Sequence, residues 1–197
     1  MALIQRPKGQ ATRAAILRKA ADLASVEGLS GLTIGCLATA LDMSKSGLFA
    51  HFGSKEGLQL ATVEAAREVF EMRVLASADS EAPGLPRLQS LVEAWIRYLE
   101  SGVFRGGCFF AAVSAEYDDR PGKVRNRIAD LTEGWRGLLE EQADQALARE
   151  QIDADADPAQ IAFELHAFLH EAARAFQLHG SADAFERARR ATRRLLG

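Results

Sequence analysis

The 197-residue sequence predicts an all-α protein, built from about nine helices. Alanine is abundant while valine and isoleucine are sparse, a composition that favours helix throughout the chain. Apolar residues recur at helical spacing in segment after segment. Between the segments stand N-capping residues, glycines and prolines, which start and stop helices. We expect an N-terminal domain over residues 1–54 and a larger helical domain over residues 55–197.

The first helix is expected from about residue 11 to residue 27, where Gly28 stops it. The residues before it form a basic arm that includes Arg6 and Lys8. Basic arms of this kind lie along DNA phosphates or in a minor groove, or they are simply solvated. The sequence leaves both alternatives open.

Residues 33–52 predict two short helices joined by a tight turn. The first helix is capped by Thr33 and has one apolar face, made of Ile34, Leu37, Ala38 and Leu41. The second begins after the N-cap Ser44 and turns Leu48 and Phe52 inward. Its outer face keeps small and basic residues and is therefore slim enough for a major groove. Together with the first helix of the chain, this pair describes a helix-turn-helix domain.

Residues 42–58 read Asp-Met-Ser-Lys-Ser-Gly-Leu-Phe-Ala-His-Phe-Gly-Ser-Lys-Glu-Gly-Leu. This run resembles the hallmark of TetR-family transcriptional repressors, in which Ser-x-x-x-Leu-aromatic-x-His-Phe leads into Lys-Glu-x-Leu. The resemblance extends over about residues 11–60 and has two departures. Phe49 stands where the family usually has Tyr, which removes a hydrogen bond to phosphate. Asp42 stands where the turn usually has Gly, and Asp tolerates the left-handed conformation better than most residues.

The resemblance implies a homodimer that binds double-stranded operator DNA and is released by a small-molecule effector. Lys45 and His51 are suited to phosphate, and a lysine at a helix N-terminus, here Lys55, makes an anion site. The expected DNA-binding residues are Thr33, Ser44, Lys45, Ser46, Gly47, Phe49, His51 and Lys55.

Six further helices are expected in the larger domain. Their start signals include the cap Ser54, Pro86 in a first turn, and the pair Asp157-Pro158. The expected ranges are about 55–77, 86–100, 108–116, 118–150, 157–179 and 181 to the end. In the family, the helix starting at Lys55 links the DNA-binding head to the body.

The resemblance also implies a ligand cavity among the middle helices of the body. The residues suited to line it are Phe70, Trp95, Tyr98, Phe109, Trp135, Phe163, His166 and His170, with Phe104 and Phe110 as further aromatic candidates. The alternative is that these aromatic residues simply fill the core. His166 and His170 share a helix face and could ligate a metal, but no further ligand set accompanies them, so a hydrogen bond to ligand or core is the preferred interpretation.

The helix expected over 157–179 is apolar on two sides, which predicts one side for the core and one for a partner. With the last helix it would form a four-helix bundle with a second copy of the chain. The expected dimer residues are Phe168, Ala172, Phe176, Phe185, Ala188 and Thr192.

Charge is unevenly distributed along the chain. Residues 1–55 hold seven basic and three acidic residues, a net charge of +4, whereas the remainder holds 17 basic and 24 acidic residues, a net charge of −7. A basic head on an acidic body suits nucleic-acid binding, although an idle charge distribution is the alternative.

Several other classes are disfavoured by the sequence. No run of about 18 apolar residues predicts a membrane span, and no signal peptide begins the chain. Cys36 and Cys108 lack metal-ligand spacing and are expected to be packed thiols in a reducing cytoplasm. Neither a Ser-His-Asp arrangement nor a nucleotide loop is visible, so we expect no enzyme, cofactor or metal. A metal-responsive regulator using His166 and His170, or an enzyme using the cavity, remains the alternative.

Overall fold

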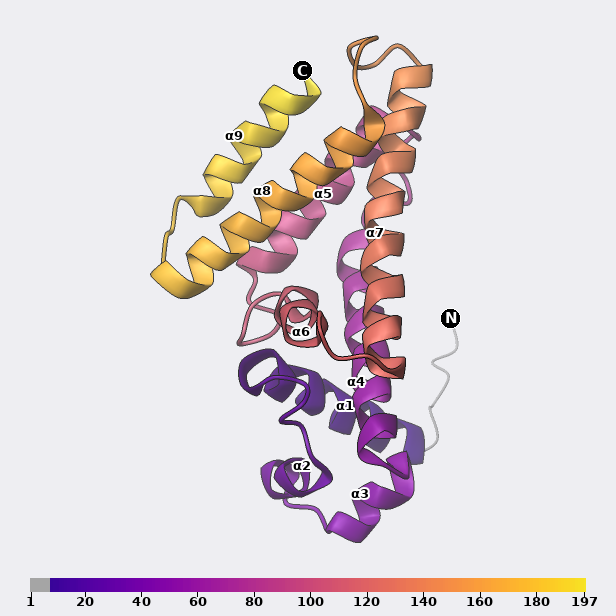
Figure 1. The fold of residues 1–197 in the computed structure, drawn as a ribbon, viewed down its shortest axis with the longest axis vertical. Coiled ribbons are helices and arrows are strands. Elements are labelled where there is room, and N and C mark those ends of the chain that lie inside the picture. Colours follow the sequence, from indigo (N-terminus) through magenta and orange to yellow (C-terminus); the bar gives the residue numbers. More distant parts are fainter. Residues whose placement is uncertain (1–7) are drawn as a thin grey trace. The chain divides into compact units, whose positions relative to one another are not determined.

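The computed structural model describes residues 8–197, and its regular structure there is entirely helical (Figure 1). This confirms the predicted all-α fold. The elements are α1 (Lys8–Glu27), α2 (Ile34–Leu41), α3 (Lys45–Phe52), α4 (Lys55–Phe70), η1 (Glu71–Leu75), α5 (Leu85–Glu100), α6 (Phe109–Tyr117), α7 (Lys123–Ala148), α8 (Pro158–His179) and α9 (Ala184–Leu196).

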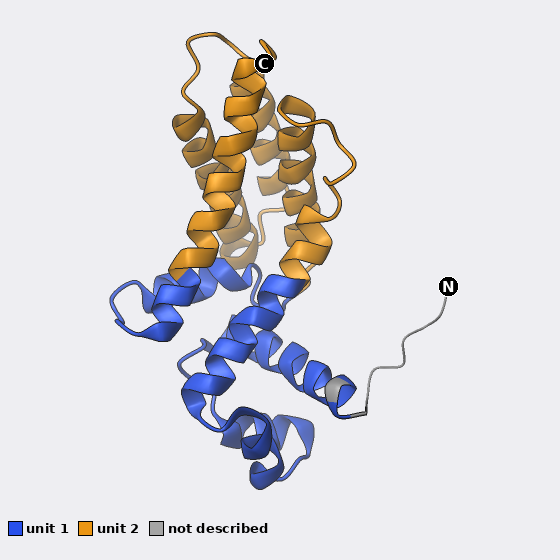
Figure 2. Ribbon diagram, turned by 90° about the vertical axis from the view of Figure 1, so that its right-hand side faces the viewer, with its two compact units in different colours: residues 1–68, 104–128 blue, residues 69–103, 129–197 orange. Residues whose placement is uncertain are grey.

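The chain forms two compact units (Figure 2). Unit 1 comprises residues 1–68 and 104–128, and unit 2 comprises residues 69–103 and 129–197. These units divide the chain differently from the expected domains 1–54 and 55–197, which remain a prediction. Of the expected basic arm, Arg6 lies outside the described residues, whereas Lys8 is already the first residue of α1.

Unit 1 has a small core beneath the helix-turn-helix. Leu37 of α2, Leu48 of α3 and Leu58 of α4 are fully buried, as the apolar periodicity predicts. Ile16 of α1 is also buried, with 1% of its surface exposed. This core fixes the short helices α2 and α3, which would be unstable alone.

The loop before α6 lies directly against α1 within unit 1. The backbone N–H and the Nε of Arg105 both donate to Asp22, at 3.1 and 2.8 Å. The N–H of Gly106 donates to Ser25 Oγ at 3.0 Å, and a Cβ atom at position 106 would lie 1.8 Å from the carbonyl oxygen of Ser25. Only glycine allows the two backbones to approach this closely.

In unit 2, α8 and α9 pack against each other and against α5. Arg189 of α9 is the main polar link, because its guanidinium donates to Glu93 and Glu100 of α5 and to Glu186 at 2.8–3.0 Å. The hydrogen bonds from Arg189 lower the pKa of Glu100, and those carboxylates in turn raise the pKa of Arg189.

Besides the earlier start of α1, three helices differ from their predicted ranges. The helix expected over 55–77 is α4 followed by the π-helical segment η1, in which Ala76 N–H reaches back five residues to Glu71. The helix expected over 118–150 is the shorter α7. The last helix begins at Ala184 rather than directly after Ser181, which instead accepts the N–H of Ala184 through its carbonyl oxygen in a turn.

Candidate nucleic-acid interface and effector site

The helix-turn-helix is held by capping hydrogen bonds at both of its helices. Thr33 Oγ1 accepts from the N–H of Cys36 at 3.1 Å, and Cys36 Sγ accepts from the N–H of Thr33 at 3.2 Å. Ser44 Oγ accepts from the N–H of Gly47 at 3.1 Å, which caps α3. Between the helices, Asp42 adopts the left-handed conformation with φ of 51°, as expected for the position where glycine is usual.

The outer face of α3 is open to solvent. Lys45, Ser46 and Ala50 are exposed, and Phe49 exposes 55% of its surface. Gly47 is half-buried beneath Ser44 Oγ, which lies 3.1 Å from where a Cβ atom would stand. The helix therefore presents a slim face with one long cation at its start, a shape that a major groove accepts.

Cationic groups and helix N-termini flank this face. Lys45 lies beside the first turn of α2, since a Cβ atom on Gly35 would stand 3.9 Å from Lys45 Nζ. Exposed Thr33 caps the same turn, so a lysine and a helix N-terminus occur together. Lys55 is exposed at the first residue of α4, and His51 is half-buried near the end of α3.

Two further residues that hold the head were missed by sequence reasoning. The carboxylate of Glu116, on α6, accepts the N–H groups of Leu29 at 2.6 Å and Ser30 at 2.8 Å. Buried Gln59 of α4 donates to the carbonyl oxygen of Leu29 at 2.8 Å. These three hydrogen bonds fix the turn between α1 and α2. Neither follows a local pattern, because Glu116 is 87 residues from Leu29 in the sequence.

Unit 2 contains a cluster of six rings, hereafter the ring cluster. Its members are Phe70, Trp95, Tyr98, Trp135, His166 and His170. Trp95 is its centre, with 2% of its surface exposed and ring centroids of Trp135 and His166 at 5.2 and 5.6 Å. Most pairs meet edge to face, the arrangement that aromatic rings prefer.

The two histidines of the ring cluster stack on each other. Their centroids are 4.1 Å apart and the ring planes differ by 26°. Burial, and then the charge of Arg136, lowers the pKa of His166. Burial, and then the charge of His166, lowers the pKa of His170 to about 4. Both imidazoles are therefore neutral near pH 7 and each offers one donor and one acceptor.

The tryptophans supply hydrogen-bond donors to the ring cluster. The indole N–H groups of Trp95 and Trp135 are both buried, and neither has a hydrogen-bond partner. A buried donor left in this state costs roughly 1–3 kcal/mol. An unpaired buried donor in a native structure calls for an explanation such as a bound water, ion or ligand, and the two indoles make this cluster a candidate effector site.

Two of the expected ligand-lining residues lie apart from the ring cluster. Phe109 is fully buried in unit 1, where it contacts Phe104 and Phe110 at centroid distances of 5.9 and 5.4 Å. Phe163 of α8 exposes 61% of its surface. Hydrophobicity alone did not distinguish these rings from the six that cluster.

The expected dimer residues are mostly buried in the single chain. Ala172, Phe185, Ala188 and Thr192 expose 3–7% of their surfaces within unit 2, where α8 and α9 pack together. Phe176 exposes 38% and Phe168 is half-buried. Because an inner and an outer apolar stripe have the same periodicity, the place of these residues at a dimer interface remains a prediction.

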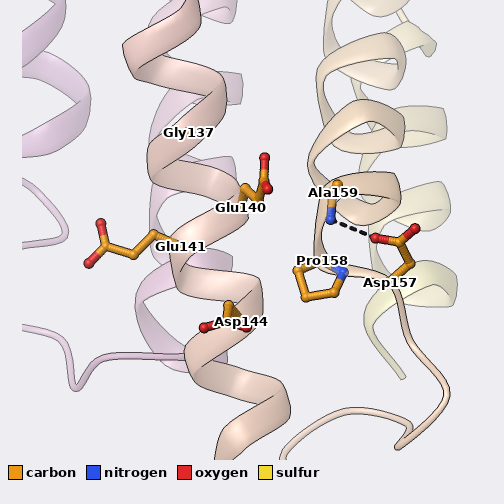
Figure 3. A pocket seen from close by; sticks show the side chains of 7 residues that line it. All are labelled: Gly137, Glu140, Glu141, Asp144, Asp157, Pro158 and Ala159. Atoms are coloured by element: carbon orange, nitrogen blue, oxygen red, sulfur yellow. Dashed lines mark hydrogen bonds between the residues drawn. The ribbon is translucent and has the colours of Figure 1, made fainter.

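A separate open pocket of about 540 Å³ lies where α7 faces the start of α8 (Figure 3). Its lining is acidic: Gly137, Glu140, Glu141, Asp144, Asp157, Pro158 and Ala159. Asp157 accepts the N–H of Ala159 at 3.0 Å and thus serves as the cap of α8. None of the expected ligand-binding residues lines this pocket. Over residues 8–197, no group of three or more His, Cys, Asp or Glu side chains is arranged to hold a metal ion.

An exposed, capped second helix with a basic start defines a helix-turn-helix protein of the kind that binds DNA. Comparison with protein families agrees with this class. A model for bacterial regulatory proteins of the tetR family matches residues 16–62, and a model for the tetracyclin repressor-like C-terminal domain matches residues 84–192. The chain belongs to the TetR family of DNA-binding transcriptional regulators, a class of regulators rather than enzymes.

Solved structures share the fold over nearly the whole chain. A TetR transcriptional regulator from Chloroflexus aurantiacus J-10-FL is 26% identical, with 94% of each chain covered and a TM-score of 0.85. AibR, solved with isovaleryl coenzyme A and operator DNA, is 25% identical over 93% of this chain and 98% of AibR, with a TM-score of 0.76. The ketosteroid transcriptional regulator KstR2 of Mycobacterium tuberculosis is 20% identical over 94% and 93%, with a TM-score of 0.71, a likeness in fold alone.

No curated protein matches the chain. Among the residues that the structure describes, none of the helices has the length and apolar character needed to cross a membrane.

Proposed function

We propose that the protein is a repressor that binds an operator through α3 and is released by a small apolar or aromatic effector bound at the ring cluster. The observation that carries the proposal is the coexistence of an open, basic-edged recognition helix and a buried cluster with two unpaired donors. These features lie in different compact units.

The DNA side of the proposal rests on the exposed face of α3. Lys45 and Lys55 neutralise phosphates, while the caps of α2 and α3 direct N–H groups toward the backbone of the duplex. Because Lys45 stands beside the first turn of α2, both elements address the same phosphate region. Counterions released by these contacts make the affinity fall steeply with salt.

The effector side rests on the continuity of α4. This one helix begins with Lys55, at the DNA-binding head, and ends with Phe70, a member of the ring cluster. A ligand that changes the packing around Phe70 therefore acts on the same helix that bears a phosphate contact. AibR, a relative of the same fold, was solved with both an acyl coenzyme A and operator DNA, which supports a dual role.

A dimer would present two copies of α3 to successive major grooves of a near-palindromic operator. Since the inner residues of α8 and α9 are occupied in the single chain, the partner would meet the outer face. The large apolar side chains that α8 leaves exposed are Phe163, Phe176 and Leu178. The ligand would then favour a spacing of the two heads that no longer fits the operator.

The test is selection of bound duplexes from a random pool, followed by affinity measurements on the selected site. Lys45→Ala is expected to weaken binding by roughly 1 kcal/mol or more and to reduce the salt dependence by about one counterion. Arg190→Ala, an exposed change on α9 in unit 2, serves as the matched control. Binding without sequence preference, or equal affinities for both variants, would remove α3 from the interface.

A further inference from the structure

The ring cluster offers more hydrogen-bond donors than acceptors. The indole N–H groups of Trp95 and Trp135 are buried without partners, although neutral imidazoles stand close to Trp95. The imidazole of His170 lies with its centroid 5.7 Å from that of Trp95 at an angle of 74°, yet its nitrogens accept nothing from the indole. The cluster's own members thus leave both donors unused.

The charges around the ring cluster disfavour a cationic ligand. None of its six members carries a carboxylate, so an ammonium group would be buried without a counter-charge. The charged side chain that acts on His166 is Arg136 of α7, whose guanidinium binds Glu133 and Glu140 at 2.5 and 3.3 Å. Because Arg136 is already paired with these carboxylates, it is the free donors within the cluster that favour a ligand supplying oxygen acceptors.

We propose that the ring cluster binds a flat apolar compound bearing an oxygen acceptor, a carbonyl or a carboxylate, which receives the indole N–H groups of Trp95 and Trp135. The rings pack against the apolar body, while the oxygen accepts hydrogen bonds that the free protein cannot make. The site discriminates strongly against analogues that lack the oxygen, because these ligands leave the buried indole donors unpaired. This inference rests on the proposed function, since it names the effector class of the same site.

The chain is well suited to a direct test, because Trp95 and Trp135 are its two tryptophans. Intrinsic tryptophan fluorescence therefore reports on this site alone. Four probes built on one benzene ring are titrated into the full-length protein: toluene without an acceptor, acetophenone with a carbonyl, benzoate with a carboxylate, and benzylamine as the cation. Calorimetry gives the same affinities without relying on the tryptophans.

The expected result is that acetophenone or benzoate binds about tenfold or more tightly than toluene, the factor that one charged or well-placed hydrogen bond supplies. Trp95→Phe and Trp135→Phe keep an aromatic ring but remove the N–H, and each is expected to reduce this preference about threefold to tenfold. Gln160→Ala, at an exposed site on the same helix as the histidines, is the matched control and keeps the full preference.

Several outcomes would overturn the inference: toluene binding as well as the oxygen-bearing probes, benzylamine binding best, no probe binding, or a preference that survives both Trp→Phe changes. If one tryptophan variant fails to fold, as judged by circular dichroism, the other decides. Each probe is also added to the complex with the selected operator. Acceptor-selective binding that leaves the operator bound would support the ligand class while contradicting release, so the two proposals fail separately.

Discussion

Phe49 is a large apolar side chain in an unusual place, because it exposes 55% of its surface on a helix that we propose to enter DNA. Phe49→Tyr is therefore expected to tighten operator binding by about 1 kcal/mol through one added hydrogen bond to phosphate. Fluorescence anisotropy on the selected operator measures the affinity. Phe49→Leu is the control, because it has no hydroxyl and is expected to bind the operator more weakly. A Tyr variant that binds no better would place this ring away from the phosphates.

His170 gives the protein a predictable sensitivity to acid. Its pKa is about 4 when folded, mainly because it is buried, and about 6.5 in an unfolded chain. Between these values the unfolded state binds more protons, so stability is complete above pH 6.5 and falls as the pH drops toward 4. The loss at pH 5 amounts to roughly 2 kcal/mol at most.

Urea unfolding at pH 7 and pH 5 measures this loss for the native protein and for His170→Gln. His170→Gln is expected to lose less unfolding free energy between pH 7 and pH 5 than the native protein, because glutamine does not titrate. His166 contributes in the same direction, since burial lowers its pKa as well. An equal loss in both proteins would show that the protonation of His170 is not linked to folding.

Individual residues were predictable where chemistry is local. The left-handed Asp42 and the cap Ser44 follow from residue type and spacing, and the structure has both. The thiol of Cys36 acting in a capping box was not foreseen, because cysteine is not a usual cap residue. The same limit applies to the ring cluster, where Trp95 and Trp135 meet only after α5 and α7 have packed.

At the scale of elements, the turn between α1 and α2 depends on a carboxylate from a distant helix. Glu116→Gln keeps one acceptor but turns an amide N–H toward the second donor, so we expect a loss of about 1–2 kcal/mol in unfolding free energy. Hydrogen exchange at the amides of Leu29 and Ser30 should accelerate as well.

Glu68→Gln, an exposed change on α4, is the control for this experiment. If exchange at Leu29 and Ser30 is the same in Glu116→Gln and in the native protein, the two short hydrogen bonds are not what holds the turn. Loss of stability without faster exchange there would likewise assign the effect to another part of unit 1.

Helix periodicity predicted the number and order of the helices well, since each has its own apolar stripe. It does not separate two arrangements that share one period. The inner stripe of α8 and α9, with Ala172 and Phe185, reads the same whether it packs within a chain or against a partner. The π-helical segment η1 could not be predicted either, because hydrogen bonds that span five residues instead of four leave no pattern in residue type.

At the scale of the whole molecule, the burial of Ala172, Ala188 and Thr192 within one chain makes a prediction about assembly. Once dilution has converted the protein to folded monomers, as sedimentation would show, the midpoint of urea unfolding should no longer change with further dilution. Unfolding of the chain at the same dilution at which the dimer dissociates would mean that the second copy completes the core.

The guanidinium of Arg189, clasped by carboxylates from α5 and from its own helix, closes the hairpin of α8 and α9 onto the same chain. These bonds lie within one chain, so they form before any second copy binds. In the proposed dimer, pairing would then depend on the concentration of the regulator, and its abundance in the cell would set how much of the operator is occupied.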